Sequence, residues 1–312
     1  MSGHRAGGRI QKNDMLRDNV KVSYYPGCTV KSRARNLEEA AIGSLAVFGV
    51  ELEELKSWNC CGAVYCLADD DLIHHVASVR TLARVKELGR DKVVTLCSMC
   101  YNTLARVNML MRSDEKKRER INLFMDREPD YHGEVEVVHF LTFLRDEIGW
   151  DRIRERVQKP LQGLKVAPYY GCTLQRPREV GIEPLGSFRI MTEFLEALGA
   201  VAVDFPAADI CCGSYQVVGN PEAAGDASAK ILGVAENAGA EALVMSCPLC
   251  EYNVGSRQEE LLHEKRIAQT IPTFYFTQLL ALALGLDTDA CRFDLNRNSC
   301  LELLQKHSLL NV

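Results

Sequence analysis

The sequence predicts an α/β protein built from two homologous halves, each with its own parallel sheet. Two observations point to this fold class. Strand-like runs alternate with segments of helical periodicity along most of the 312 residues, as is typical of parallel α/β units. An unusual cysteine pattern also occurs twice, about 150 residues apart, which predicts an internal duplication because this period is too long for a solenoid repeat.

The first half starts with a strand-like run, KVSYYPGC at residues 21–28, and continues with alternating helical and extended segments. The helix predicted at 38–50 ends near Gly49. The helix predicted at 69–89 opens on three aspartates and closes on a glycine, which favours both of its ends. The other predicted segments are a run at 51–58 that leads into a cysteine pair, a strand at 91–97 and a helix at 98–111.

The second half repeats this order. Its predicted strands and helices cover residues 164–172, 188–199, 200–206, 221–239, 241–247 and 248–254. We therefore divide the chain into a flexible leader, a first domain, a connector, a second domain and a C-terminal tail, at residues 1–20, 21–145, 146–162, 163–287 and 288–312. The charged stretch at 111–134 is expected to be a solvated helix face or an excursion between the halves.

Ten of the thirteen cysteines form the repeated pattern. In each half the pattern has three parts. The first is a single cysteine that follows a Tyr-Tyr run. The second is a pair of adjacent cysteines followed by a glycine, and the third is a Cys-x-x-Cys motif. Corresponding positions lie 144, 151 and 150 residues apart. The first set is Cys28, Cys60, Cys61, Cys97 and Cys100, and the second set is Cys172, Cys211, Cys212, Cys247 and Cys250.

The cysteines of both sets fall at or shortly after the ends of predicted strands. In a parallel sheet the carboxyl ends of the strands share one edge, where ligands bind, so five sulfurs per half can converge there. A Cys-x-x-Cys at the start of a helix also lies beside backbone N–H groups that favour the thiolate. The glycines behind the pairs, Gly62 and Gly213, permit a positive φ or a close approach of the backbone to a bulky core.

So many cysteines in a reducing compartment indicate metal binding, redox chemistry or both, and not a disulfide scaffold. Structural zinc takes four ligands in a closed tetrahedron, and a regular [4Fe–4S] cubane also takes four cysteines. Five sulfurs per half favour a more open iron–sulfur core, with zinc in one or both halves as an alternative. A thioredoxin-like dithiol would leave the single cysteine and the adjacent pair unexplained.

The motifs Cx31CCGx34CxxC and Cx38CCGx33CxxC resemble the tandem CCG motif of the B subunit of heterodisulfide reductase and its relatives. The resemblance covers about residues 22–285 and includes the contexts YYPGCT, WNCCG and TLCSMCYN. It implies two Rossmann-like halves whose clusters lie at the strand C-terminal ends between them. Each set of five cysteines would bind one non-cubane [4Fe–4S] cluster.

The resemblance also implies an activity. A disulfide would be cleaved, or formed, by two one-electron steps in a cleft between the two clusters. The substrate would be the coenzyme M–coenzyme B heterodisulfide, another disulfide or a sulfur-carrier protein. The cluster ligands themselves are the only catalytic residues that the resemblance implies.

Partners follow from what the motifs lack. The chain contains neither the C-x2-C-x2-C-x3-C-P run of bacterial ferredoxins nor a G-x-G-x-x-G nucleotide motif, so we expect no flavin or nicotinamide site. The resemblance implies a ferredoxin-like subunit of the C type and, through it, a flavin-containing A-type subunit. Two other roles stay open: an electron-transfer subunit of a quinone-linked succinate, glycolate or lactate dehydrogenase, and a zinc-binding scaffold without catalysis.

Composition limits the partners and the location. A net charge of −5 without a dominant basic block does not favour nucleic acid. The polar leader lacks the apolar segment of a signal peptide, and no stretch approaches the roughly 18 apolar residues of a membrane span. We therefore expect a cytoplasmic protein without a transmembrane segment. The most apolar run, at 276–286, is expected to be a buried or partner-facing helix.

Three cysteines lie outside the repeat. Cys66 has no counterpart in the second half and is expected to be a small buried residue or a modifier of the first site. Cys291 and Cys300 are expected to be incidental. Trp58 and Tyr65 flank the first cysteine pair and are expected to shield it from water or to pack in the core.

Histidines and basic residues near the motifs have structural as well as functional explanations. His74 and His75 are expected at the surface or in helix packing. His139 follows a predicted strand and is a core residue or a donor to a cluster sulfur or substrate. Three basic residues near the single cysteines either face solvent or receive an anionic substrate: Lys31, Arg33 and Arg176.

Overall fold

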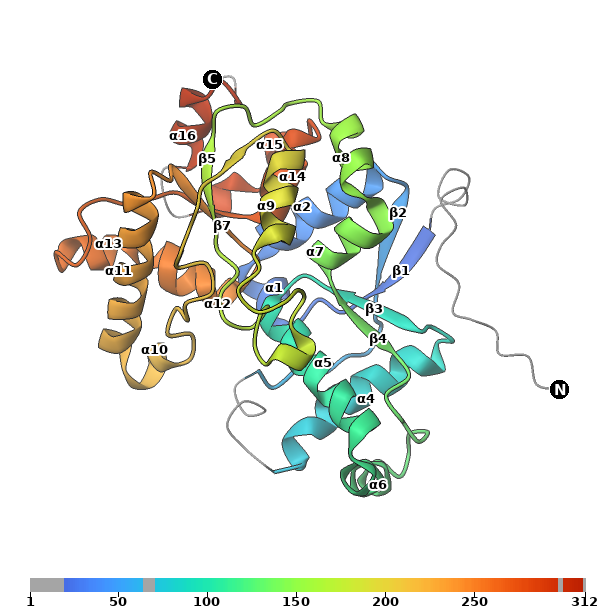
Figure 1. Ribbon diagram of the computed structural model, residues 1–312. Coiled ribbons are helices and arrows are strands. Elements are labelled where there is room, and N and C mark those ends of the chain that lie inside the picture. Colours follow the sequence, from blue (N-terminus) through green and yellow to red (C-terminus); the bar gives the residue numbers. More distant parts are fainter. Residues whose placement is uncertain (1–19, 64–70, 297–299, 311–312) are drawn as a thin grey trace.

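The computed structural model describes residues 20–63, 71–296 and 300–310. It contains two four-stranded sheets with parallel strand pairs (Figure 1). The strand orders are β2-β1-β3-β4 and β6-β5-β7-β8. Because the second order repeats the first with every number raised by four, the fold confirms the predicted α/β class and the internal duplication.

The strands are short and end where the cysteine-bearing segments begin. The first sheet consists of β1 (Val20–Tyr24), β2 (Val50–Glu54), β3 (Lys92–Thr95) and β4 (Glu136–His139). The second consists of β5 (Lys165–Pro168), β6 (Val201–Ala202), β7 (Ala242–Met245) and β8 (Thr273–Tyr275). The inner strands β1, β3, β5 and β7 are mostly buried, as expected when helices cover both faces of a parallel sheet.

Helices connect the strands. Those of the first half are α1 (Cys28–Arg33), α2 (Arg35–Ala46), α4 (Ile73–Glu87), α5 (Ser98–Ser113), α6 (Glu115–Phe124) and α7 (Phe140–Phe143), followed by η2 (Leu144–Ile148) and α8 (Trp150–Arg156). The second half has η3 (Arg178–Val180), α9 (Arg189–Ala197), α10 (Gln216–Gly219), α11 (Pro221–Asn237), α12 (Pro248–Cys250), η4 (Glu251–Ser256), α13 (Gln258–His263) and α14 (Phe276–Ala283). After α14 come α15 (Thr288–Cys291), η5 (Phe293–Leu295) and α16 (Cys300–Lys306).

The halves pack against each other through equivalent helices (Figure 1). Helix α2, which follows β1, contacts α14, which follows β8; in the same way α9, after β5, contacts α7, after β4. The ring of Phe276 lies 5.8 Å from that of Phe140 and 5.9 Å from that of Phe194. Nearby, Thr277 Oγ1 donates a hydrogen bond to Leu37 O at 2.9 Å. An apolar seam thus joins the two copies.

The most apolar run of the sequence is part of this seam. All residues of α14 are buried, which confirms the buried helix predicted within 276–286. In the part of the chain that the structure describes, no helix is both long and apolar enough to cross a membrane.

Two predicted helices differ from the structure. The helix predicted at 38–50 is α2 (Arg35–Ala46), because Gly49 has a positive φ of 72° and Val50 already pairs with Val20 in the sheet. The regular helix predicted at 248–254 is instead the short α12 followed by the π-helix η4. A π-helix is uncommon and often lies at a functional site, and this one directly follows Cys250.

Two glycines let the backbone pass close to a sulfur. Gly27 and Gly171 precede the single cysteines and have φ values of 78° and 66°, which favour glycine. A Cβ on Gly27 would lie 2.7 Å from the Sγ of Cys100. The equivalent Cβ on Gly171 would lie 3.0 Å from the Sγ of Cys250. Each single-cysteine turn is therefore pressed against the last cysteine of its own set.

The glycines behind the cysteine pairs differ in the room around them. Gly62 and Gly213 have φ values of 69° and 79°. Among the described residues, a Cβ added to Gly62 would contact only His74 O, at an ordinary van der Waals distance of 3.8 Å. A Cβ on Gly213 would lie 2.7 Å from the Cα of Ala224. The second pair is therefore packed against helix α11.

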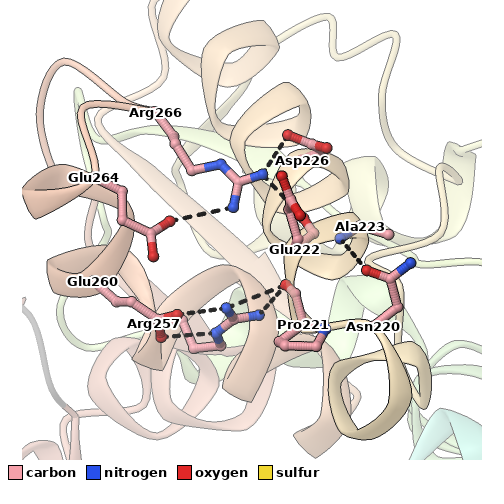
Figure 2. Close-up of polar contacts among 9 residues, drawn as sticks. All are labelled: Asn220, Pro221, Glu222, Ala223, Asp226, Arg257, Glu260, Glu264 and Arg266. Carbon is pink, nitrogen blue, oxygen red and sulfur yellow. Dashed lines mark hydrogen bonds and ion pairs between the residues drawn. The ribbon is translucent and has the colours of Figure 1, made fainter.

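Two arginines hold the start of α11 in place (Figure 2). The buried guanidinium of Arg257 donates to the carbonyl of Pro221 at 3.4 Å. Arg266 donates to the carbonyl of Glu222 at 3.0 Å and forms an ion pair with Asp226. The first turn of α11 cannot move away from the second cysteine pair without breaking these contacts.

Alanine at the two glycines is therefore expected to cost different amounts of stability. Gly62→Ala should lower the free energy of unfolding by about 1–2 kcal/mol, the cost of a positive φ for an L-residue. Gly213→Ala should cost about 1–3 kcal/mol more, because the new Cβ overpacks against a fixed helix. Chemical denaturation of the metal-free variants, followed by circular dichroism, measures both values, and equal losses would contradict the packing argument.

Candidate metal centre

The first cysteine set comes together at the carboxyl edge of the first sheet. Cys28 opens α1 after β1, and Cys97 is the N-cap of α5 after β3. The Sγ atoms of Cys28 and Cys60 lie 3.4 Å apart. Those of Cys61 and Cys100 lie 3.6 Å apart. Residues more than 30 positions apart along the chain are thus in contact through sulfur, as the parallel order of the strands predicts.

The second set repeats this arrangement. The Sγ atoms of Cys212 and Cys250 lie 3.6 Å apart, which is the equivalent of the contact between Cys61 and Cys100. The thiols of Cys172 and Cys211 influence each other, which raises the pKa of Cys172 and lowers that of Cys211. The structure thus brings the members of each predicted set to one edge of their sheet.

The sulfur pairs are contacts between free thiols. An S–S bond would be about 2.05 Å long, whereas two thiolates on one tetrahedral metal, each about 2.3 Å from it, would lie about 3.8 Å apart. The observed separations of 3.4–3.6 Å are close to the second value. Within the described ranges, three or more Cys, His, Asp or Glu side chains do not surround one point closely enough for a single ion. The printed sulfur contacts join the donors in pairs.

Hydrogen bonds between the sulfurs set their charges. The pKa of the buried Cys61 thiol is lowered to about 4, because Cys100 and then Cys60 donate hydrogen bonds to its thiolate. The donor Cys100 has its pKa raised by the same contact. In the second set the pKa of Cys211 is lowered to about 6 by the hydrogen bond from Cys172. Each set therefore holds some thiolate and some thiol, so binding a metal core would release protons.

The two sets approach each other where the halves meet. The pKa of Cys247 is lowered by the neighbouring side chains of Cys250 and, across the interface, of Cys97. The Oγ atoms of Ser98 and Ser246 are hydrogen-bonded at 2.5 Å, also across the interface. The Cys-x-x-Cys turns of the two halves are therefore in contact, and their four cysteines are buried.

The other cysteines lie nearer the surface. Cys28, Cys60 and Cys211 are exposed, and Cys172 is partly exposed, whereas the second cysteine of each adjacent pair is buried. In each set, the Cys-x-x-Cys cysteines are therefore buried near the contact between the halves, and the single cysteine and the first cysteine of the pair lie nearer to solvent. Cys66 and Tyr65 lie outside the described residues.

Equivalent tyrosines fix the loops that carry the cysteine pairs. The hydroxyl of Tyr25 donates to Asn59 O at 2.8 Å, just before the first pair. The hydroxyl of Tyr169 donates to Ile210 O at 2.7 Å, just before the second pair. Sequence reasoning missed this role, although the repeated Tyr-Tyr run was its signal. Trp58 packs edge-to-face on Tyr25 at 5.6 Å, so it braces the first loop and is partly buried.

A second missed residue supports Cys212 directly. The buried Nδ2 of Asn253 donates to the carbonyls of Cys212 and Ser214 at 3.1 and 3.2 Å, and it lies 3.7 Å from the Cys212 sulfur. In the first half Thr103 takes this place, beside the thiolate of Cys61. Thr103 and Asn253 each lie three residues after a Cys-x-x-Cys motif, and this shared position was the sequence signal for their role.

His139 is a core residue with both ring nitrogens in use. Its Nδ1 accepts a hydrogen bond from Leu141 N at 3.3 Å, which caps α7, and this tautomer lets Nε2 donate to Leu96 O at 3.2 Å. Burial lowers its pKa to about 3, so the ring is neutral. Neither nitrogen is left for a cluster sulfur or a substrate.

The remaining predicted residues have protein partners or solvent around them. Lys31 pairs with Glu38 and Glu54, and Arg176 pairs with Asp209. Arg33 is exposed. His74 and His75 are partly buried on α4, whereas Cys291 and Cys300 are buried away from both sets.

The comparisons with known proteins agree with this site. A model of the cysteine-rich domain named CCG matches residues 22–105 and 166–255, which is one copy in each half. The membrane anchor subunit of 8-methylmenaquinol:fumarate reductase from Wolinella succinogenes is 30% identical over 89% of this chain and 96% of its own length. The B subunit of the ferredoxin/F420H2-dependent CoB–CoM heterodisulfide reductase from Methanosarcina acetivorans is 29% identical over 92% of this chain and 97% of its own.

Two further relatives widen the picture. A protein from Archaeoglobus profundus, described as similar to the B subunit of heterodisulfide reductase, is 26% identical over 86% of this chain and 92% of its own. The crystal structure of a hypothetical protein from Helicobacter pylori has the same fold, with a TM-score of 0.70 at 14% identity. It covers 88% of this chain, which corresponds to 51% of that protein.

The matched domains include both cysteine sets, and the relatives extend over nearly the full length of the described fold. This chain therefore belongs to the family of tandem cysteine-rich CCG proteins that includes the B subunits of heterodisulfide reductases.

Proposed function

We propose that this chain is the catalytic iron–sulfur subunit of a heterodisulfide-reductase-like complex, which interconverts a disulfide and two thiols. Each cysteine set would hold one non-cubane [4Fe–4S] cluster. The first cluster would take Cys28, Cys60, Cys61, Cys97 and Cys100, and the second Cys172, Cys211, Cys212, Cys247 and Cys250. The observation that carries this proposal is that the Cys-x-x-Cys turns of the two five-cysteine sets are in contact where the halves join.

The chemistry requires two electrons and two protons for each disulfide that becomes two thiols. The two cysteine sets would hold iron–sulfur groups, which when bound would supply one-electron chemistry without a flavin in this chain. The protein itself binds these groups, excludes water from the buried Cys-x-x-Cys turns and leaves the outer sulfurs accessible. A disulfide would approach from the edge where Cys28, Cys60 and Cys211 are exposed.

Electrons would come from partner proteins. A ferredoxin-like subunit of the C type, and through it a flavin-containing A-type subunit, would complete the complex. The names of the relatives support a multi-subunit reductase, since two of them are B subunits of ferredoxin-dependent heterodisulfide reductases. In such a complex this chain would act in the cytoplasm.

A second role is favoured by one specific relative. The membrane anchor subunit of a menaquinol:fumarate reductase is 30% identical to this chain over most of both lengths. In the corresponding role the chain would pass electrons between a quinone and a partner dehydrogenase, and no disulfide would be cleaved. The contact between the two sets suits electron transfer as well, so experiment has to separate the roles.

Anaerobic reconstitution is expected to load about eight irons per chain, as two clusters of four. Cys61→Ser and Cys212→Ser each remove one buried sulfur from one set, so each should lower the iron content by about half. Cys291→Ser changes a buried cysteine outside both sets and serves as the matched control with full iron content. About four irons or fewer in the wild-type chain, or zinc in both sites, would contradict the proposed clusters and favour a scaffold.

The reconstituted chain is also expected to oxidise a reduced viologen when a disulfide is added. We expect two viologen radicals to be consumed and two thiols to appear for each disulfide, which the thiol assay and absorbance measure together. Cys212→Ser should lower this rate by at least about 100-fold, since a cluster ligand is lost, whereas Cys291→Ser keeps it. The coenzyme M–coenzyme B heterodisulfide and simple low-molecular-weight disulfides are the probes.

Liposome flotation with and without menaquinone separates the second role from the first. The disulfide role predicts that the chain stays in the soluble fraction and does not exchange electrons with the quinone. Firm binding to the vesicles together with quinone reduction, and no thiol release from any disulfide, would sink the disulfide proposal and support the quinone-linked one.

A further inference from the structure

Asn102 connects the helix of the first Cys-x-x-Cys to the turn that carries Cys172. It lies on α5, two residues after Cys100, and its side chain is 0% exposed. Its Nδ2 donates to the carbonyl of Thr173 at 2.8 Å and to that of Arg176 at 2.7 Å. A buried side chain of the first half therefore holds a ligand turn of the second half.

The connection continues to the second cysteine pair. Arg176 Nη1 donates to Asp209 O at 2.9 Å, and its Nη2 forms an ion pair with the carboxylate of the same residue. Asp209 stands two residues before Cys211. The guanidinium is half exposed, so the ion pair itself adds little stability. The bond to the main-chain carbonyl nevertheless fixes the course of the loop that leads into the pair.

A neighbouring residue strengthens the same junction. Tyr101, directly before Asn102, donates its hydroxyl to Val180 O at 3.0 Å. Val180 lies in η3, at the far end of the segment that begins with Cys172. Two consecutive residues of α5 thus hold residues 173–180 at two points.

Among the described residues, the side-chain hydrogen bonds of Asn102 and Arg176 are not repeated at the equivalent positions of the other half. The position that corresponds to Asn102 in the second half is Tyr252, 150 residues later, and it is 47% exposed. The position that corresponds to Arg176 is Ser32, whose Oγ donates to Cys28 O at 2.8 Å within its own turn. Ser32 thus bonds within the first turn itself, whereas the second turn accepts hydrogen bonds from the first half.

We infer that Asn102 is a positioning residue for the second cysteine set. Through Thr173, Arg176 and Asp209 it sets the placement of Cys172 and Cys211 relative to the first half. The assembly and stability of a metal core in the second set therefore depend on a side chain next to the first set. This inference rests on the proposed function only for the metal core, because the contacts exist in the metal-free chain.

Hydrogen exchange of the metal-free chain tests the inference directly. Asn102→Ala removes the side-chain donor to the buried carbonyl of Thr173 and to the partly buried carbonyl of Arg176. Amide exchange in the 170–182 segment, where Arg176 N bonds to Cys172 O and Ile182 N to Leu174 O, should become about tenfold faster. The equivalent first turn at 26–34 should keep its rate. An unchanged rate at 170–182 overturns the inference.

Asn108→Ala is the matched control on the same helix. Asn108 is also buried, and its Nδ2 donates to Val135 O at 2.6 Å, but its partners all belong to the first half. This variant should speed exchange at 131–136 and leave 170–182 unchanged. Equal acceleration at 170–182 in both variants would overturn the inference, because it would indicate a general loosening of α5.

A surface variant covers the case in which Asn102→Ala does not fold. Arg176→Gln removes only the bonds to Asp209, and it should speed exchange at 207–213 about threefold or more without an effect at 26–34. No change at 207–213 would remove the proposed path to Cys211 and overturn the inference.

Iron retention provides a second readout. In a Cys61→Ser variant only the second cysteine set is intact, so iron loss reports on that set. Adding Asn102→Ala to this variant should make the loss of iron to a chelator about tenfold faster. If the Cys61→Ser variant and the Cys61→Ser/Asn102→Ala variant lose iron at the same rate, the inference is wrong for the iron-loaded chain. If the wild-type chain binds no iron at all, the proposed function fails, while the exchange result still decides the role of Asn102.

Discussion

The convergence of sulfur atoms on one edge is the constraint on which the rest of this molecule depends. Each set draws thiols from three separate turns, and only parallel strands deliver all of those turns to the same edge. Thiolates packed this closely would repel one another. Instead, neighbouring sulfurs share protons, so that Cys61 is stabilised as thiolate while Cys100 remains a thiol donor. The sheets can therefore hold the site in shape before any metal arrives.

Sequence reasoning reached the duplication, the parallel sheets and the grouping of the cysteines, because spacing along the chain carries that information. It did not predict the residues whose roles depend on contacts with distant parts of the chain. Asn102 meets the second half only after both sheets have formed. Arg176 is a candidate substrate ligand by sequence, whereas it pairs with Asp209, 33 residues away. The π-helix η4 also lacked a signal, since the first half continues as a regular helix at the same place.

The two halves are copies in topology but differ around their cysteines. The second pair is packed against α11, whereas among the described residues a Cβ on Gly62 would meet only His74 O, at 3.8 Å. The second turn relies on the opposite half, and an amide supports Cys212 where a hydroxyl stands beside Cys61. Metal groups of the same composition would therefore meet different hydrogen-bond donors and different degrees of rigidity. Such surroundings are among the factors that set reduction potentials, so two clusters of the same composition would differ in potential if bound here.

The helix contacts between the halves have a further consequence. Helix α2 meets α14 and α9 meets α7, and each pair joins the helix after the first strand of one copy to the helix after the last strand of the other. This reciprocal pattern is that of an isologous interface, in which one patch is complementary to itself. An ancestor with a single copy would bury the same helices by forming a twofold homodimer. In a single chain each half can differ from the other, so a symmetric arrangement of helices can carry the one-sided bond from Asn102.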